Sequence, residues 1–163
     1  MSTTHHTDAF DLQEFDVRYL VTGLWQSMLG LDIQRGAASI PADTWLAAAI
    51  DIRGAFVGRV ELCCDAELAR LAAAQLMSIE VTACTHDDAR DAILELTNVA
   101  GGNIKALVDG LCDLSFPHRI DPTAERCGQE VEIGAWSFTC LGRGVTLRVI
   151  AHPGRGGGQS ARS

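Results

Sequence analysis

A single amphipathic stretch, residues 85–111, restricts the possible folds of this 163-residue chain more than any other segment. Apolar residues recur in it at steps of three and four, which is the spacing that one face of an α-helix requires. They are Ile93, Leu96, Ala100, Ile104, Leu107 and Leu111. We therefore predict one long helix that ends near Gly110, with its apolar side packed against a core and its other side facing solvent.

The opposite side of this predicted helix is not an ordinary solvated face. Its residues recur at the same steps and are Asp91, Glu95, Asn98, Gly102 and Lys105. A carboxylate, Glu95, and a carboxamide, Asn98, lie three residues apart, so both side chains point the same way. Gly101 and Gly102 follow in the next turn, although each glycine costs a helix about 1 kcal/mol relative to alanine. The close approach of another surface at that turn would compensate for this cost.

The start of the helix is marked by a cluster of acidic residues. Thr85 or Asp87 is a suitable N-cap, and the carboxylates that follow favour the positive end of the helix dipole. Together with His86, the cluster also has the residue types of a metal site. Because its carboxylates are mostly consecutive and point in different directions, we favour the dipole explanation and predict no metal site.

The rest of the chain has patterns typical of an α+β fold. The predicted helices span residues 15–29 and 65–77. The predicted strands span residues 44–50, 55–63, 130–141 and 145–151. Asp51–Gly54 supplies a turn between the first two strands, which would form an antiparallel hairpin. This order predicts an antiparallel sheet with helices packed on one face. Residues 12–151 would form one domain, between a mobile tail at 1–11 and a disordered tail at 152–163.

Composition and charge argue against several classes of protein. Acidic residues outnumber basic ones and give a formal net charge of -8, which argues against nucleic-acid binding and against docking on anionic membranes. The chain has no run of about 18 apolar residues, and its first residues lack the layout of a secretory signal. We therefore expect a cytoplasmic protein. Its six cysteines contain no C-x-x-C pair and are interpreted as reduced apolar residues, with a set of structural disulfides as the alternative.

The pattern on the polar face resembles the signature helix of a known family. Asp91, Glu95-Leu-Thr-Asn98 and Gly102-Asn103 are similar to the motif of the CheX/CheC chemotaxis phosphatases, which hydrolyse the aspartyl phosphate of response-regulator receiver domains. The resemblance extends from about residue 17 to residue 150. It implies a CheX-like fold, a phosphorylated CheY-like receiver domain as partner, and a homodimer. It also implies that the protein needs no cofactor of its own, because the receiver domain supplies Mg2+.

Two features of the resemblance stay open. The family has a proline some distance after the motif, and both Pro117 and Pro122 are candidates. The helix predicted over 15–29 would be a degenerate copy of the motif helix, with Tyr19 and Thr22 in place of the acid and the amide. The internal similarity of the sequence is too weak to prove a duplication.

The chemistry of the side chains and the resemblance together suggest roles for the polar face. A carboxamide accepts a hydrogen bond from water and donates one to a phosphoryl oxygen, so Asn98 is expected to orient the attacking water. The resemblance implies that Glu95 pairs with the active-site lysine of the receiver domain. Asn103 is interpreted as a structural residue bonded to nearby backbone. The residues expected to contact the partner are Asp91, Gly101, Gly102 and Lys105. The alternative is a receiver-binding or scaffolding module that hydrolyses nothing.

Overall fold

The computed structural model describes residues 12–37, 44–126 and 128–153. Within them, the helices are α1 (Glu14–Leu29), α2 (Ala66–Met77) and α3 (His86–Lys105), and a short 3-10 turn, η2 (Val81–Ala83), joins α2 to α3. The strands are β1 (Gln34–Arg35), β2 (Trp45–Gly54), β3 (Gly58–Asp65), β4 (Cys112–Leu114), β5 (His118–Ile120), β6 (Val131–Cys140) and β7 (Arg143–Ala151). The tail predicted at 1–11, and most of the one predicted at 152–163, lie outside the described residues.

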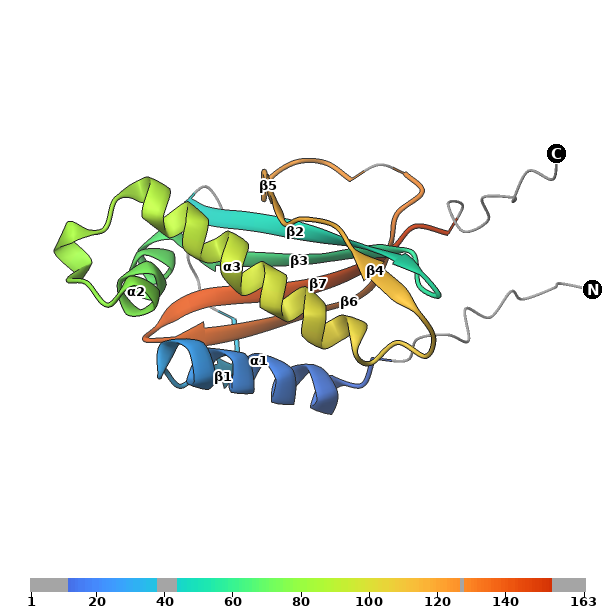
Figure 1. Ribbon diagram of the computed structural model, residues 1–163, viewed down its shortest axis with the longest axis horizontal. Helices are drawn as coiled ribbons and strands as arrows, with labels where there is room; N and C mark the ends of the chain where they lie inside the picture. The colour runs from blue at the N-terminus through green and yellow to red at the C-terminus, as the bar shows by residue number, and fades with distance from the viewer. Residues whose placement is uncertain (1–11, 38–43, 127, 154–163) are drawn as a thin grey trace, which may run out of the picture.

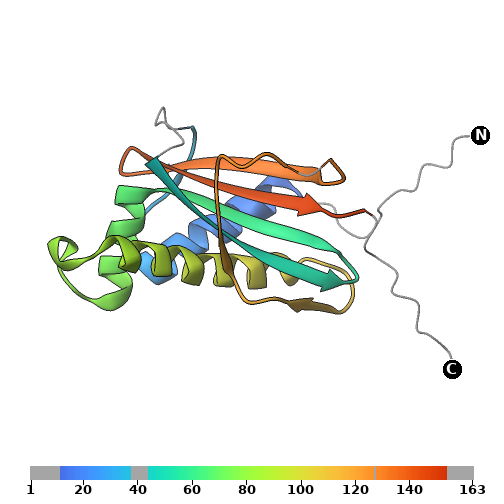
Figure 2. The ribbon, with the colours of Figure 1, turned by 90° about the horizontal axis from the view of Figure 1, so that it is seen from above.

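The strands form one antiparallel sheet, which confirms the predicted α+β class. The order across the sheet is β1-β6-β7-β3-β2-β4, and β5 pairs with β2 beside β4. α1 and α3 lie side by side over one face of the sheet, and α2 packs at one end (Figures 1 and 2). The segment between β5 and β6 crosses over the other face (Figure 2).

Alternation along the strands determines which side of the sheet the helices bury. In β2, Ala48, Ile50 and Ile52 are fully buried in the core under the helices, and β7 shows the same alternation. Burial of a large aliphatic side chain contributes about 1.5–3 kcal/mol. A shift of the strand pairing by one residue would turn all of these buried side chains to the opposite face of the sheet. The register of the central strands is therefore strongly specified.

The predicted hairpin between the first two strands is present, but its turn lies further along the chain. β2 continues to Gly54, so Asp51 pairs with Arg59 of β3 instead of beginning a turn. Gly54 has a φ of 127°, and a Cβ on it would overlap the carbonyl of Leu111. The next residue, Ala55, donates its N–H to that same carbonyl at 2.9 Å. The glycine therefore allows the chain before β4 to approach β2, and the turn predicted at Asp51–Gly54 is wrong.

α3 is shorter than predicted, because it ends at Lys105 rather than near Gly110. After Lys105 the chain changes to 3-10-type hydrogen bonding. The backbone N–H groups of Leu107 and Val108 each donate to the carbonyl three residues earlier. Val108 is thereby buried, while Leu107 is 39% and Leu111 92% exposed. The prediction that Leu107 and Leu111 complete the buried stripe is wrong.

The two halves of the chain repeat the same order of elements. α1, β1, β2 and β3 in the first half correspond to α3, β4, β6 and β7 in the second. The sheet is equivalent when read from either edge, because β1 pairs with β6 and β4 pairs with β2. Each half thus adds its short strand to the hairpin of the other half. This topology supports the interpretation of α1 as a counterpart of α3.

Five of the six cysteines are described, and all five are buried and free. Burial raises the pKa of Cys63 to about 11, so its thiol stays protonated at neutral pH. These five residues agree with the interpretation of reduced apolar cysteines, whereas Cys127 lies outside the described residues.

The C-terminal limit of the ordered domain lies beyond Ala151. His152 donates its backbone N–H to the Val57 carbonyl at 3.0 Å, and its Nδ1 lies 3.8 Å from Oε1 of Glu130. The described residues thus extend two positions beyond the domain limit predicted at residue 151. Among the described residues, no helix has both the length and the apolar character needed to cross a membrane.

Candidate functional site

α3 begins with a capping box that uses part of the acidic cluster. The Thr85 hydroxyl accepts from the Asp88 N–H at 3.1 Å, and the Asp88 carboxylate accepts from the Thr85 N–H at 2.8 Å. Asp87 lies 3.5 Å from Arg90 one turn later. Of the two predicted caps, Thr85 is the one that the helix uses. In the described part of the chain, no group of three His, Cys, Asp or Glu side chains is placed to hold a metal ion.

Asp91, Glu95 and Asn98 lie on the exposed side of α3. Between the last two, Leu96 and Thr97 are fully buried on the side that faces the core. The Thr97 hydroxyl donates to the carbonyl one turn earlier at 2.7 Å, so the helix itself satisfies this buried polar group. A helix with a buried reverse side therefore presents an acid and an amide to solvent.

The Glu95 and Asn98 side chains form no hydrogen bond or ion pair with any residue that the structure describes. Residues three apart on a helix have Cβ atoms about 5–6 Å apart, so one bound group can contact both side chains. Glu95 and Asn98 are exposed, and α3, which carries them, lies in front of the sheet in Figure 1. A small ligand binds best in a cavity that buries most of its surface. This exposed position therefore favours the surface of another macromolecule as the partner.

The two glycines of α3 have different environments. A Cβ on Gly101 would overlap the side chain of Ile50 in β2, and Gly101 is buried. A Cβ on Gly102 would meet no atom within 4 Å. The expectation that Gly101 contacts a partner is therefore wrong, because this glycine allows α3 to pack closely on its own sheet. Gly102 lies on the open side, where a partner can approach it.

Asp91 has a partner that the sequence did not reveal. Nη2 of Arg119 in β5 lies 3.4 Å from Oδ1 of Asp91. β5 places Arg119 opposite Ala48, whose side chain is buried under the helices, so alternation directs Arg119 toward α3. The two residues are 28 positions apart. They meet only because β5 adds to β2, and the predicted elements did not include this short strand.

Two further residues lie near the end of α3. Lys105 is half-buried in the last turn, where a cation interacts favourably with the helix dipole. Asn103 is also half-buried, but its side chain forms no hydrogen bond with the residues that the structure describes. The backbone bond expected for Asn103 is therefore not observed.

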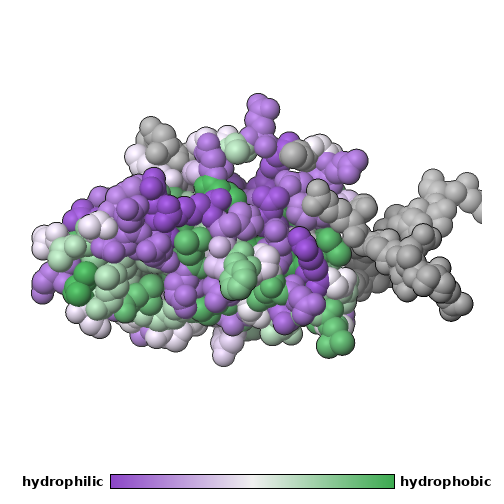
Figure 3. All heavy atoms as spheres, turned by 45° about the horizontal axis from the view of Figure 1, so that its top comes forward, coloured by the Kyte–Doolittle hydropathy of each residue, from purple (hydrophilic) through white to green (hydrophobic). Residues whose placement is uncertain are grey.

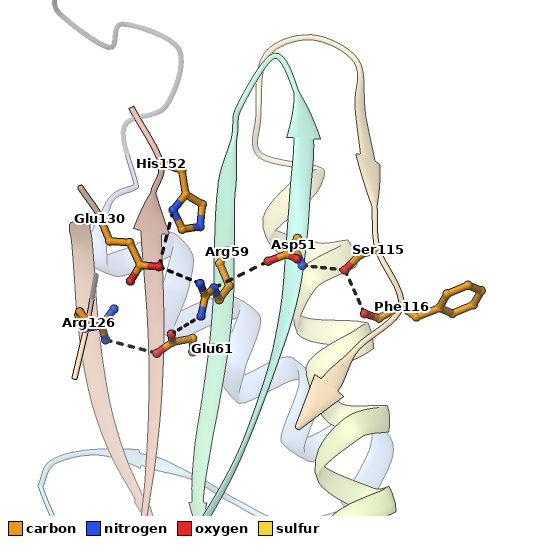
Figure 4. A network of polar contacts seen from close by, with 8 residues as sticks. All are labelled: Asp51, Arg59, Glu61, Ser115, Phe116, Arg126, Glu130 and His152. Atoms are coloured by element: carbon orange, nitrogen blue, oxygen red, sulfur yellow. Dashed lines mark hydrogen bonds and ion pairs between the residues drawn. The ribbon is translucent and has the colours of Figure 1, made fainter. Parts of the chain in front are cut away.

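A second polar cluster lies on the face of the sheet opposite the helices, centred on Arg59 (Figure 4). The Arg59 guanidinium lies 2.8 Å from Glu130 Oε1 and 3.5 Å from Glu61 Oε1. Its Nε lies 3.7 Å from Asp51 Oδ1. Arg126 lies 3.3 Å from the other carboxylate oxygen of Glu61. These pairs fasten the chain before β6 to the sheet.

A groove of about 560 Å3 runs beside this cluster, between the sheet and the chain that follows β5. Its lining includes Arg59, Glu61, Arg126 and Glu130, which are already paired with one another. Figure 3 shows hydrophilic residues gathered along the upper part of the view, with more hydrophobic residues among them lower down. Because the arginines that line the groove are already paired with neighbouring carboxylates, we place the candidate site on α3.

A family model described as "Chemotaxis phosphatase CheX" matches residues 46–140, which include the whole of α3. A search among curated proteins finds no significant match. The fold is similar to that of chemotaxis protein CheX from Vibrio vulnificus, with a TM-score of 0.66 and 13% identity over 83% of this chain and 93% of that one.

Two other solved structures are also similar. The CheX-CheY-BeF3-Mg+2 complex from Borrelia burgdorferi contains a chain that matches with a TM-score of 0.62 and 15% identity, over 84% of this chain and 96% of that one. A CheC-like superfamily protein from Shewanella sp. PV-4 matches with a TM-score of 0.62 and 13% identity, over 85% and 98% of the two chains. At these identities the likeness establishes the fold.

Proposed function

Because the chain belongs to the CheX family of chemotaxis phosphatases, we propose that it hydrolyses the aspartyl phosphate of a CheY-like receiver domain. The observation that carries the proposal is the pair of unpartnered side chains, Glu95 and Asn98, on the exposed side of α3. The Borrelia burgdorferi complex joins a protein of similar fold to CheY in the presence of BeF3 and Mg2+. That complex supports a receiver domain as the partner of this chain.

Asn98 is the residue that orients the attacking water. In-line displacement requires the water opposite the leaving carboxylate, so catalysis depends mainly on positioning and electrostatics. A carboxamide accepts a hydrogen bond from the water through its oxygen and donates one to a phosphoryl oxygen through its NH2 group. A carboxylate at the same position would be repelled by the phosphoryl charge. The exposed and unpartnered state of Asn98 leaves both groups available for this task.

Glu95 docks the helix on the receiver domain. By resemblance to the family, its carboxylate pairs with the active-site lysine of the receiver and fixes the angle of approach. Its position one turn before Asn98 lets the two side chains contact neighbouring groups of the partner. Gly102 and Lys105 lie further along α3 and border the same interface.

The chain needs no cofactor of its own for this reaction. The receiver domain supplies the Mg2+, and this protein contributes the positioned water and the docking contacts. Because receiver domains act in the cytoplasm, we also place this protein there.

The test follows phosphate loss from CheY-like receiver domains of the same organism, charged with acetyl phosphate in Mg2+. Asn98→Ala should lower the turnover rate on the order of 100-fold with little effect on binding, because it removes a group that acts in the transition state. Glu95→Ala should weaken binding as well. Both residues are exposed, so the free energy of unfolding should change by less than about 0.5 kcal/mol.

Two outcomes would contradict the enzymatic proposal. A parent protein that binds a charged receiver without accelerating phosphate loss would be a scaffolding module. An Asn98→Ala variant as active as the parent would mean that another residue orients the attacking water.

We further propose that the protein forms a homodimer through the edge strand β4. No described strand pairs with the outer side of β4, and such an edge is available for pairing with a second chain. Leu111 and Phe116 flank β4, and each is 92% exposed. The Phe116 ring points away from the strands in Figure 4. Sedimentation equilibrium should show a dimer for the parent and a monomer for Phe116→Glu, and a monomeric parent would refute this part of the proposal.

A further inference from the structure

We propose that Arg119 is a docking residue for the receiver domain and that Asp91 positions it. This inference rests on the proposed function and extends the interface from α3 to the neighbouring strand β5. The observation behind it is the contact of 3.4 Å between Arg119 Nη2 and Asp91 Oδ1. Asp91 thereby acts mainly through Arg119, and the partner meets the arginine.

The surroundings of Arg119 leave it available to a partner. Its side chain is 50% exposed and that of Asp91 is 72% exposed. A guanidinium has five N–H donors, and Asp91 is the only described residue that accepts a hydrogen bond from the Arg119 side chain. The remaining donors can pair with a carboxylate of the partner in the fork geometry that arginine favours.

Electrostatics give the arginine a function on this face. Without Arg119, the part of α3 from Asp91 to Asn98 presents two exposed carboxylates, Asp91 and Glu95, to the partner. A protein-bound phosphoryl group carries a charge of about -1.5 to -2 at neutral pH, so two carboxylates would oppose the approach of the phosphorylated face. Arg119 neutralises Asp91 and presents its remaining N–H donors where the partner approaches. Because the overall net charge is -8, this local neutralisation is important for association with a negatively charged partner face.

The position of Arg119 predicts which kinetic constant it controls. Asp91 and Asn98 are seven residues apart on α3, which corresponds to about 10 Å along a helix. Arg119 therefore contacts the partner away from the reacting phosphoryl group. Charges at the rim of an interface change association and its salt dependence more than the chemical step.

The experiment compares Arg119→Gln with Arg35→Gln as a matched control. Arg35 is also part of an exposed ion pair between two elements, with Glu14 at 2.9 Å, and it lies in β1 at the opposite edge of the sheet. Both variants remove one positive charge and one ion pair, and Arg35→Gln also removes a hydrogen bond of 2.7 Å to the Ser137 carbonyl. We measure KM and kcat for receiver domains charged with acetyl phosphate, and Kd for the same receivers loaded with BeF3- and Mg2+.

Arg119→Gln should raise KM and Kd about 3- to 5-fold, the range expected for one exposed ion pair, while kcat changes less than about 2-fold. The salt dependence of kcat/KM should become weaker in this variant. Arg119→Lys should recover part of the loss because it keeps the charge, and Arg35→Gln should behave as the parent does.

The outcomes separate this inference from the proposed function. If Arg119→Gln and Arg35→Gln have the same Kd for a receiver that the parent binds, the inference is wrong even where Asn98→Ala abolishes turnover. If the parent binds the receiver without hydrolysis, the enzymatic proposal fails while the Kd comparison still decides the role of Arg119. If no receiver domain binds to the parent, both proposals are overturned.

Discussion

α1 and α3 cover the same face of the sheet with matching buried sides and different exposed sides. When Tyr19 is aligned with Glu95, four buried pairs coincide: Val17 with Ile93, Val21 with Thr97, Leu24 with Ala100, and Trp25 with Gly101. Three exposed pairs coincide as well: Phe15 with Asp91, Tyr19 with Glu95, and Thr22 with Asn98. The topology that relates the two halves of the chain thus extends to the burial of single residues on these helices.

The comparison shows that a helix packed in this way on the sheet is not sufficient to form the candidate site. The outer face of α1 presents two aromatic rings, with Phe15 75% and Tyr19 72% exposed, and a hydroxyl in place of the carboxamide. A hydroxyl is too short to bridge a water and a phosphoryl oxygen from the same helical position as Asn98. Of these two described helices, only α3 has an acid and an amide at this spacing. The functional difference between the helices therefore lies in two or three exposed side chains.

The buried pair Trp25 and Gly101 gives the first way to test the comparison. Trp25 is fully buried and fills the space under α1, whereas Gly101 lets α3 contact Ile50 directly. Gly101→Ala should force the helix off the sheet, but Gly102→Ala should add a Cβ in open space. Both changes stabilise the helix by about 1 kcal/mol through the higher helix propensity of alanine. The difference in stability between the two variants therefore measures the steric cost at Gly101.

We expect Gly101→Ala to be less stable than Gly102→Ala by about 1–3 kcal/mol, the usual cost of overpacking a core. Urea denaturation measures both variants, with the parent as reference. Equal unfolding midpoints for the two variants would mean that α3 does not depend on close contact at Gly101. The two helices would then pack on the sheet in the same way despite their different residues.

The elements that local patterns specify could be predicted from the sequence. The apolar stripes of α1, α2 and α3 and the alternation in the long strands gave the correct class, and Asp65 caps α2 through hydrogen bonds to two backbone N–H groups. β4 and β5 could not be predicted, because strands of three residues are too short for an alternating pattern and form only through the open edge of β2. The end of α3 was misjudged because Leu107 and Leu111 continue the helical spacing after the helix has stopped.

The candidate site was predictable to the extent that it lies on one helix. Asp91, Glu95 and Asn98 share a face because of helical spacing alone, which a sequence displays directly. Gly101 and Arg119 depend on tertiary contacts, with Ile50 in one case and with Asp91 across 28 positions in the other. A costly glycine in a helix indicates a close approach, but it does not indicate whether the approaching surface belongs to a partner or to the protein's own sheet.

The smallest expected effect, on α1, tests whether the two faces differ in function. Thr22→Ala should leave the rate of receiver dephosphorylation within about 2-fold of the parent, because an exposed residue outside the catalytic face contributes little to the transition state. Asn98→Ala, the same truncation at the matching position of α3, provides the contrast in the same phosphate-release assay. Both residues are exposed, so neither change should alter stability by more than about 0.5 kcal/mol. If Thr22→Ala slowed the reaction as strongly as Asn98→Ala, α1 would also contact the phosphorylated partner. The acid and the amide of α3 would then not account for a functional difference between the two helices.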